Sequence, residues 1–222
     1  MDMAETIYGA ITPTGASFKR PVVRAPPVRT QRLLTLVDEN VHQPAFTRIH
    51  VVPSMMATGP HAAALKVLAL LLGGGNTSYL HEALIVNNRM ATWVGASYWG
   101  NVSRGLASFQ IGACPAPGVS LADLDDAIEN ALDMLRRSGF SADDIRSAKS
   151  RIVANAIYQK DDHSNLALQY GVAASLGLSV EDVALWQERI KGVTTEDIRN
   201  ALTLLERSTG IVGYLTPPAT DA

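Results

Sequence analysis

Residues 70–80 read Leu70-Leu71-Leu72-Gly73-Gly74-Gly75-Asn76-Thr77-Ser78-Tyr79-Leu80, an apolar helix pattern that runs into three consecutive glycines. Three adjacent glycines cost backbone entropy, so we expect that this point needs a positive φ angle or a close approach of two backbones. The side chain of Asn76, Thr77 or Ser78 can cap a second helix. The stretch therefore predicts a tight corner between two helices. Because a glycine loop before a helix can also present amide N–H groups to an anion, a ligand cradle stays open at this point.

The composition fits one globular domain, or one domain with an extension. The chain has 222 residues, of which 47% are hydrophobic and 18% charged, and its formal net charge is −2. A charge this close to zero gives no support for a nucleic-acid partner. No apolar run approaches the roughly 18 residues of a membrane span, so we expect none. The N-terminus Met1-Asp2-Met3-Ala4-Glu5 lacks the basic and apolar regions of a signal peptide. An upstream extension would hide an export signal, so the compartment stays open.

The first 31 residues do not have the pattern of a core. Residues 3–8 can end a helix, with Gly9 as the stop signal. The following stretch alternates prolines with basic side chains and contains no acid, a composition that favours extended, solvated backbone. We interpret it as a linker, and a basic segment lying across a partner surface is the alternative.

From residue 31 onward the apolar pattern predicts an α+β domain. Strands are predicted at 33–37, 46–52, 91–99, 106–113 and 209–215, and helices at 61–72, 77–88, 121–137, 142–160, 165–176, 180–190 and 195–206. The loop 39–45 is predicted to join the first two strands as a hairpin, and the loop 100–105 to join the next two. Paired strands followed by paired helices favour an antiparallel sheet of about five or six strands with helices packed on one face.

No metal-binding motif stands in the chain. His81-Glu82-Ala83-Leu84-Ile85 begins like H-E-x-x-H, which binds zinc through two histidines four residues apart, but Ile85 occupies the last place. No two of the five histidines are three or four residues apart, and the inverted motif H-x-x-E-H is absent as well. His50 falls within a predicted strand and is interpreted as a structural histidine. We therefore expect no metal ligands in this chain.

Other catalytic patterns are also missing. The glycine stretch lacks the Gly-Lys-Ser/Thr of a phosphate-binding loop, and Cys114 has no histidine nearby in the sequence. The acidic pairs at 125–126, 143–144 and 161–162 are interpreted as favourable charges near helix N-termini. We predict no catalytic residue.

Taken in order, several short motifs resemble the second-half domain of the M16 (insulinase or pitrilysin-like) zinc peptidases. The run from Leu71 to Leu80 resembles the family pattern L-G-G-G-x-x-S-R-L, and Ala91-Thr92-Trp93-Val94-Gly95-Ala96-Ser97-Tyr98 resembles the strand that follows it. Further matches are Pro117-Gly118-Val119, Ala148-Lys149-Ser150-Arg151, Val193-Thr194-Thr195-Glu196-Asp197-Ile198 and Gly213-Tyr214-Leu215. The resemblance covers about residues 30–216 and is nearest to bacterial processing-peptidase-like members.

The resemblance implies a domain arrangement and a partner. Residues 1–30 would be the end of a preceding half plus an inter-domain linker, and residues 31–222 a C-terminal-type M16 domain. In the family, two similar halves close around an unfolded peptide, and one half carries the zinc site. This chain resembles the half without zinc, which implies a catalytic M16 half as partner, in the same longer chain or as a separate subunit, with zinc bound there. The chain alone is expected to be inactive.

The same resemblance suggests which residues face the peptide. Gly73, Gly74, Gly75 and Thr92 are the candidate substrate-binding residues, because the corner and the following strand would border the shared chamber. Many members place an arginine and, seven residues later, a tyrosine at the positions of Ile85 and Thr92, whereas Arg89 and Tyr98 are out of register. These differences leave two functions open: a non-catalytic half that helps to bind extended peptides, or a scaffold subunit without a role in proteolysis.

Overall fold

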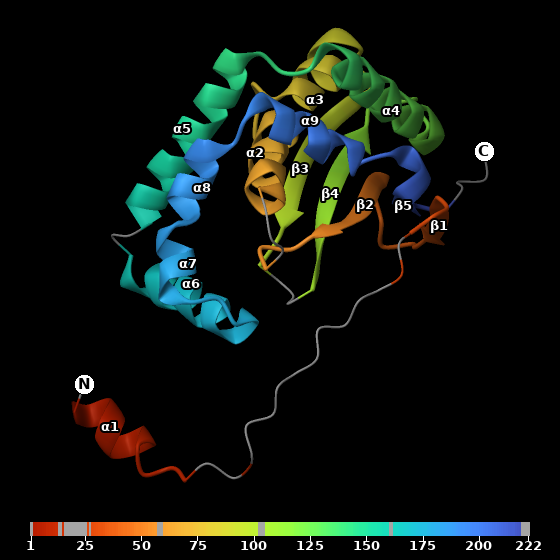
Figure 1. The fold of residues 1–222 in the computed structure, drawn as a ribbon. Helices are drawn as coiled ribbons and strands as arrows, with labels where there is room; N and C mark the ends of the chain where they lie inside the picture. Colours follow the sequence, from red (N-terminus) through yellow and green to blue (C-terminus); the bar gives the residue numbers. More distant parts are fainter. Residues whose placement is uncertain are drawn as a thin grey trace.

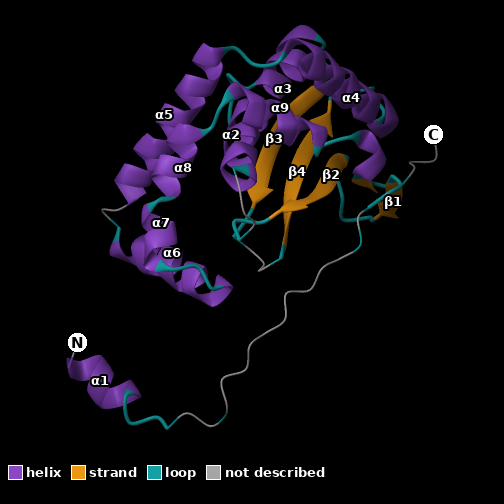
Figure 2. Cartoon of the chain, in the orientation of Figure 1, coloured by secondary structure: helices purple, strands orange, loops and turns teal. Residues whose placement is uncertain are grey.

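The computed structural model describes residues 2–12, 15, 26, 28–56, 60–101, 105–159 and 162–218. At the centre of these residues is a five-stranded sheet in the order β1-β5-β2-β4-β3. Its strands are β1 (Arg32–Val37), β2 (Ala45–Pro53), β3 (Ala91–Trp99), β4 (Leu106–Pro115) and β5 (Ile211–Thr216). Helices α2, α4 and α9 pack over one face, which confirms the predicted α+β fold (Figures 1 and 2).

The helices follow the predicted order. They are α1 (Asp2–Tyr8), α2 (His61–Gly73), α3 (Tyr79–His81), α4 (Leu121–Ser138), α5 (Ala142–Tyr158), α6 (His163–Leu176), α7 (Val180–Ala184), α8 (Trp186–Gly192) and α9 (Thr195–Thr203). The π-helical turn η1 (Glu82–Asn87) follows α3, and the 3₁₀ turn η3 (Arg207–Thr209) precedes β5. No helix of the described residues is long and apolar enough to cross a bilayer.

The predicted hairpin between the first two strands is wrong. β5 lies between β1 and β2, parallel to β1 and antiparallel to β2, so the sheet is mixed at this edge. Neighbouring strands are about 4.8 Å apart, and the short loop after β1 can therefore step across one intervening strand. The β3–β4 hairpin is confirmed, with a bulge between Ala91 and Trp93. Residues 102–104 of its connection lie outside the described residues.

Alternation along β2 divides the two faces of the sheet. Phe46, Arg48, His50 and Val52 are buried under the helices, whereas the intervening residues are half-buried or exposed. The predicted core helix α2 is confirmed, since nine of its 13 residues are buried. It contacts β3 and β4 on one side and α5, α8 and α9 on others, which explains why α2 is apolar around most of its surface.

Helices α4, α5 and α9 begin where predicted, whereas the predicted side-chain cap of the helix after the glycines is wrong, because Ser78, the N-cap of α3, makes no capping hydrogen bond. The hydroxyls of Ser120, Ser141 and Thr194 each accept a hydrogen bond from the amide three residues ahead, as expected of N-caps. The helix predicted at 180–190 is two helices, α7 and α8, separated by a turn at Leu185. The helix predicted at 77–88 is α-helical only over α3 and then continues as η1.

The N-terminal helix prediction is confirmed by α1, which ends where the Gly9 amide donates to the carbonyl oxygen of Glu5 at 2.9 Å. Most of residues 10–30 lie outside the described residues, so the linker and the domain boundary at 30/31 stay predictions.

Candidate functional site

The glycine corner forms where the end of α2 meets the edge strand β3. A Cβ atom on Gly73 would lie 2.0 Å from the amide nitrogen of Ala96 and 2.5 Å from the carbonyl carbon of Gly95. Real Cβ contacts are never this short, so only glycine lets the two backbones approach this closely. Gly73 thus locks the C-terminal end of α2 onto β3.

Gly74 and Gly75 complete the corner in different ways. A Cβ atom on Gly74 would meet the Leu70 side chain at 2.2 Å, and the Gly74 carbonyl accepts a hydrogen bond from Arg151 Nη2 at 3.1 Å. Gly75 has a φ of +125°, a conformation that side-chain-bearing residues rarely adopt. The predicted tight corner is therefore confirmed. It opens into a three-residue α-helix, which is too short to offer an anion-binding N-terminus.

The π-helical turn η1 carries Ile85 toward the core. Ile85 is half-buried and packs against the hydrophobic core, so this position offers no charged group. Just after the turn, the Met90 amide donates to the Leu84 carbonyl at 2.7 Å, and Arg89 between them has a φ of +51°. Arg89 is exposed. π-helical turns are rare and occur frequently at functional sites.

Thr92 is the extra residue of the bulge at the start of β3. Its hydroxyl accepts from Gln43 Nε2 at 3.3 Å and donates to the carbonyl oxygen of Cys114 at 3.4 Å. Tyr98, near the other end of the strand, is buried, and its hydroxyl donates to the Pro53 carbonyl at 2.7 Å. Burial raises the pKa of Tyr98 well above its usual value. Both hydroxyls thus have structural partners.

The sheet face opposite the helices carries an apolar surface. Residues directly opposite one another in the strand register share a face, which places Leu34, Gly213, Thr47, Gly112 and Gly95 in one row across all five strands. Neighbouring rows on this face hold large apolar side chains: Leu36, Ile49, Val51, Trp93 and Trp99. Trp93 and Trp99 are 55% and 50% exposed, although both are large and apolar. A surface of this kind favours an interaction with another molecule or domain.

Trp93 lies across the glycines of this row. A Cβ atom on Gly95 would lie 2.9 Å from the Trp93 ring, and a Cβ atom on Gly112 would lie 3.1 Å from it. The glycines therefore make room for the indole, which covers their backbones on an otherwise uncovered face. We call the face that bears Leu34, Leu36, Val51, Trp93 and Trp99 the open sheet face.

The described residues do not fit a zinc site. They contain no group of three or more His, Cys, Asp or Glu side chains that could hold a metal ion. His50, the strand histidine, is fully buried, and its Nδ1 lies 3.3 Å from Thr209 Oγ1. Burial first, and then the positive charges of Arg48 and Arg136, lower the pKa of His50 to about 4. Its interpretation as a structural residue agrees with this environment.

A buried ion-pair network beneath α4 was not predicted from the sequence. Arg48 on β2 pairs with Asp125. Arg48 also pairs with Glu129, at 2.5 Å, and Arg207 on η3 pairs with Asp125 at 2.8 Å. The interpretation of Asp125 as a charge at a helix start is therefore wrong, because this carboxylate neutralises two arginines from distant segments. The sequence did contain a hint of this network, because Arg48 occupies one of the alternating positions of β2 that face the core.

Comparison with protein families gives a match over most of the chain. The model for the peptidase M16 inactive domain matches residues 1–152. No curated protein matches the sequence.

Solved structures share the fold at low identity. A protease from Helicobacter pylori is 16% identical with a TM-score of 0.85, over 97% of this chain and 51% of that one. A peptidase M16 inactive domain from Pseudomonas fluorescens is 14% identical with a TM-score of 0.77, over 100% of this chain and 51% of that one. The periplasmic protease PqqL from Escherichia coli is 14% identical with a TM-score of 0.74, over 96% of this chain and 24% of that one. The chain thus spans about half the length of the first two proteins.

The matched residues include strands β1 to β4, helix α2 and the glycine corner at its end. The chain belongs to the peptidase M16 family and corresponds to its inactive domain.

Proposed function

We propose that this domain is the non-catalytic half of an M16-type zinc metallopeptidase, which closes a chamber with a zinc-bearing half and helps to bind extended peptides there. The carrying observation is the open sheet face, where Trp93 and Trp99 are half exposed on a strand whose other face is packed in the core. Zinc and the reacting water belong to the partner in this proposal. This chain contributes confinement and orientation of the peptide.

In this proposal, the four predicted substrate-binding residues shape the edge strand that would contact the peptide. Gly73, Gly74 and Gly75 fix the angle between α2 and the edge strand β3, and Thr92 lies in the bulge of that strand. An edge strand has unpaired backbone groups on its outer side, which can pair with an extended peptide. Binding by these residues would therefore use backbone geometry more than side-chain charge.

The second candidate is a scaffold subunit that kept the fold without a role in proteolysis. Two observations favour it: Ile85 packs into the core, and the Thr92 hydroxyl already has two hydrogen-bond partners. Neither residue can then act on a substrate as a charged or freely available group.

Co-expression separates the two candidates. The chain is produced with the H-x-x-E-H half encoded upstream or in an adjacent reading frame, and association and zinc-dependent peptide hydrolysis are measured. The chamber proposal expects a stable complex that is active, with each half inactive alone. Hydrolysis by the isolated chain, or neither association nor activity on co-expression, contradicts it. A complex in which this chain leaves the partner's activity unchanged supports the scaffold.

The open sheet face can be tested in the same assay. Trp99→Asp places a charge on that face and is expected to lower association and activity at least about tenfold, since a central aromatic residue at an interface contributes about 2 kcal/mol or more. Met134→Asp is the matched control, because Met134 is 63% exposed on α4, which packs on the opposite side of the sheet. Equal effects of the two variants would remove the open sheet face from the proposal.

A further inference from the structure

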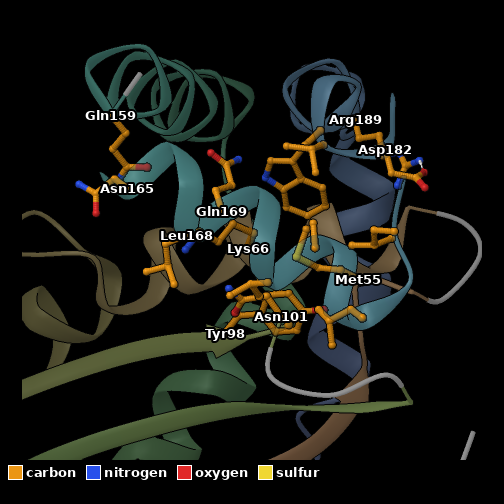
Figure 3. Close-up of a pocket in the computed structure, with 17 residues that line it drawn as sticks. Met55, Lys66, Tyr98, Asn101, Gln159, Asn165, Leu168, Gln169, Asp182 and Arg189 are labelled. Carbon is orange, nitrogen blue, oxygen red and sulfur yellow. Dashed lines mark hydrogen bonds and ion pairs between the residues drawn. The ribbon is translucent and has the colours of Figure 1, made fainter. Parts of the chain in front are cut away.

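A concave site lies away from the glycine corner, between α6 and the residues that follow β3. The cavity has a volume of about 370 Å³ and is bordered by α2, α6, α7 and α8 as well as by residues just after β2 and β3. This volume is at the lower end of the range for ligand pockets, about 300–1,000 Å³. Figure 3 shows side chains from these separate segments pointing into one space.

Helix α6 presents its apolar stripe to this cavity. The lining residues of α6 recur at the spacing of a single helix face: Asn165, Leu168, Gln169, Val172, Ala173 and Leu176. A stripe of this kind normally packs against another element. Here Ala173 and Leu176 are buried at the inner end, whereas Leu168 at the outer end is 64% exposed beside the open part of the cavity.

The opposite wall is rigid and aromatic. Tyr98 is held by its hydrogen bond to the Pro53 carbonyl, and its ring lies over Gly100, where a Cβ atom would be 2.3 Å away. Trp186 from α8 also lines the cavity. Aromatic walls and the α6 stripe together offer an environment for one large apolar group.

The charges of the lining favour an anionic neighbour for that group. Asp182 and Arg189 form an ion pair at 2.7 Å, so their charges neutralise each other. Lys66, the third charged lining residue, is exposed, and within the described ranges it has no ion-pair partner. Gln169 and Asn101 add amide groups, which can both donate to and accept from a peptide backbone.

We propose that this cavity is a peptide subsite that takes one large apolar side chain, with Lys66 pairing with an acidic residue next to it. The inference rests on the proposed function in peptide binding and adds a sequence preference to it. A peptide uses more of the lining than an acyl chain with a carboxylate, because the exposed amide groups of Gln169 and Asn101 can pair with its backbone.

The test uses the full chain and three fluorescein-labelled hexapeptides that differ only at their centre: Phe-Glu, Phe-Lys and Ala-Glu. Fluorescence anisotropy measures each affinity. We expect the Phe-Glu peptide to bind tightest, the Phe-Lys peptide about fivefold more weakly and the Ala-Glu peptide at least about tenfold more weakly. Lys66→Glu, an exposed substitution compatible with folding, should reverse the order of the first two.

A pair of substitutions on α6 locates the binding. Val172→Phe fills the cavity and should weaken the Phe-Glu peptide at least about tenfold, whereas Ala174→Phe on the exposed side of α6 should leave its affinity unchanged. No binding of any peptide up to ~1 mM overturns the proposal. Equal binding of all three peptides also overturns it. So does binding of oleate that is tighter than binding of the Phe-Glu peptide, if Val172→Phe abolishes that oleate binding.

The outcome can be separated from that of the proposed function. If co-expression yields an active complex while these peptides do not bind, the subsite is wrong and the chamber proposal stands. If the peptides bind as expected but no active complex forms, the subsite stands as a property of this chain, and its role in proteolysis falls.

Discussion

Arg48 on β2 and Asp125 on α4 form a buried ion pair, with their side chains 0% and 2% exposed. The carboxylate also accepts from Arg207, and Glu129 accepts from a second nitrogen of Arg48, so three segments meet at this pair. Such a pair is held by its partners: removing one leaves an uncompensated charge in the interior.

Asp125→Asn should therefore destabilise the domain strongly. We expect a loss of about 3–5 kcal/mol in the free energy of unfolding, because the buried guanidinium of Arg48 would keep its charge with only Glu129, which it shares with Arg136, and Arg207 would lose its buried partner. Urea unfolding followed by circular dichroism measures it. Asp143→Asn is the control, since Asp143 and Arg146 form an exposed pair that should contribute nothing measurable. If both variants lost a similar free energy of unfolding, burial of the Arg48–Asp125 pair would not explain the effect.

His50 should make stability depend on pH. Its pKa is lowered from 6.5 to about 4 in the folded state, so the unfolded chain binds the proton more readily. The stabilisation is fully present above about pH 6.5 and falls by about 3 kcal/mol as the pH drops toward 4. His50→Leu removes the titrating group, and its unfolding free energy should fall less between pH 6.5 and 4. Parallel curves for the two proteins would show that His50 does not titrate as proposed.

Gly73→Ala should disrupt the corner. The added methyl group would collide with the backbone of β3 at 2.0 Å, and overpacking of this kind costs about 1–3 kcal/mol. Gly171→Ala offers a matched comparison, since Gly171 lies inside α6 with open space around its Cβ position and should gain about 0.5–1 kcal/mol. Thermal unfolding of both variants tests the sign. A neutral Gly73→Ala would mean that α2 and β3 are not locked together.

Arg151→Met should loosen the corner locally. It removes the hydrogen bond to the Gly74 carbonyl while keeping a long apolar stem, so we expect global stability to change by less than about 1 kcal/mol. Amide hydrogen exchange between residues 75 and 78 should become several-fold faster, and exchange in the sheet should not change. Unchanged exchange at the corner would indicate that the glycines hold their conformation without Arg151.

Features that depend on nearby residues were predicted well. The predicted helix starts at residues 121, 142 and 195 agree with α4, α5 and α9, and the predicted end of α2 at the glycines is also correct, because each boundary arises from residues within one helical turn. The same holds for the β3–β4 hairpin and the burial of α2, since alternation and three-to-four spacing are local patterns. The ordered motifs then identified the M16 resemblance that the family match confirms.

Features that depend on distant partners were not predicted. Local periodicity predicts that residues 33–37 form a strand. It cannot show that β5 lies between β1 and β2, because the pairing of Arg32 with Ile211 joins residues far apart in the sequence. Local periodicity shows that Arg48 occupies a buried position of β2, but it does not identify its partner Asp125, which lies 77 residues later in the sequence. The cavity beside α6 likewise needs Lys66, Tyr98 and Trp186 to meet.

The sequence alone thus determined the elements, the glycine corner and the family of this protein, because each is encoded by residues close together in the chain. Only the tertiary structure decided the strand order, the partner of the buried arginine, the open sheet face and the cavity beside α6. Each of these arises when segments far apart in sequence come together, and the free energy of that assembly comes from burying apolar surface and pairing polar groups across the whole domain.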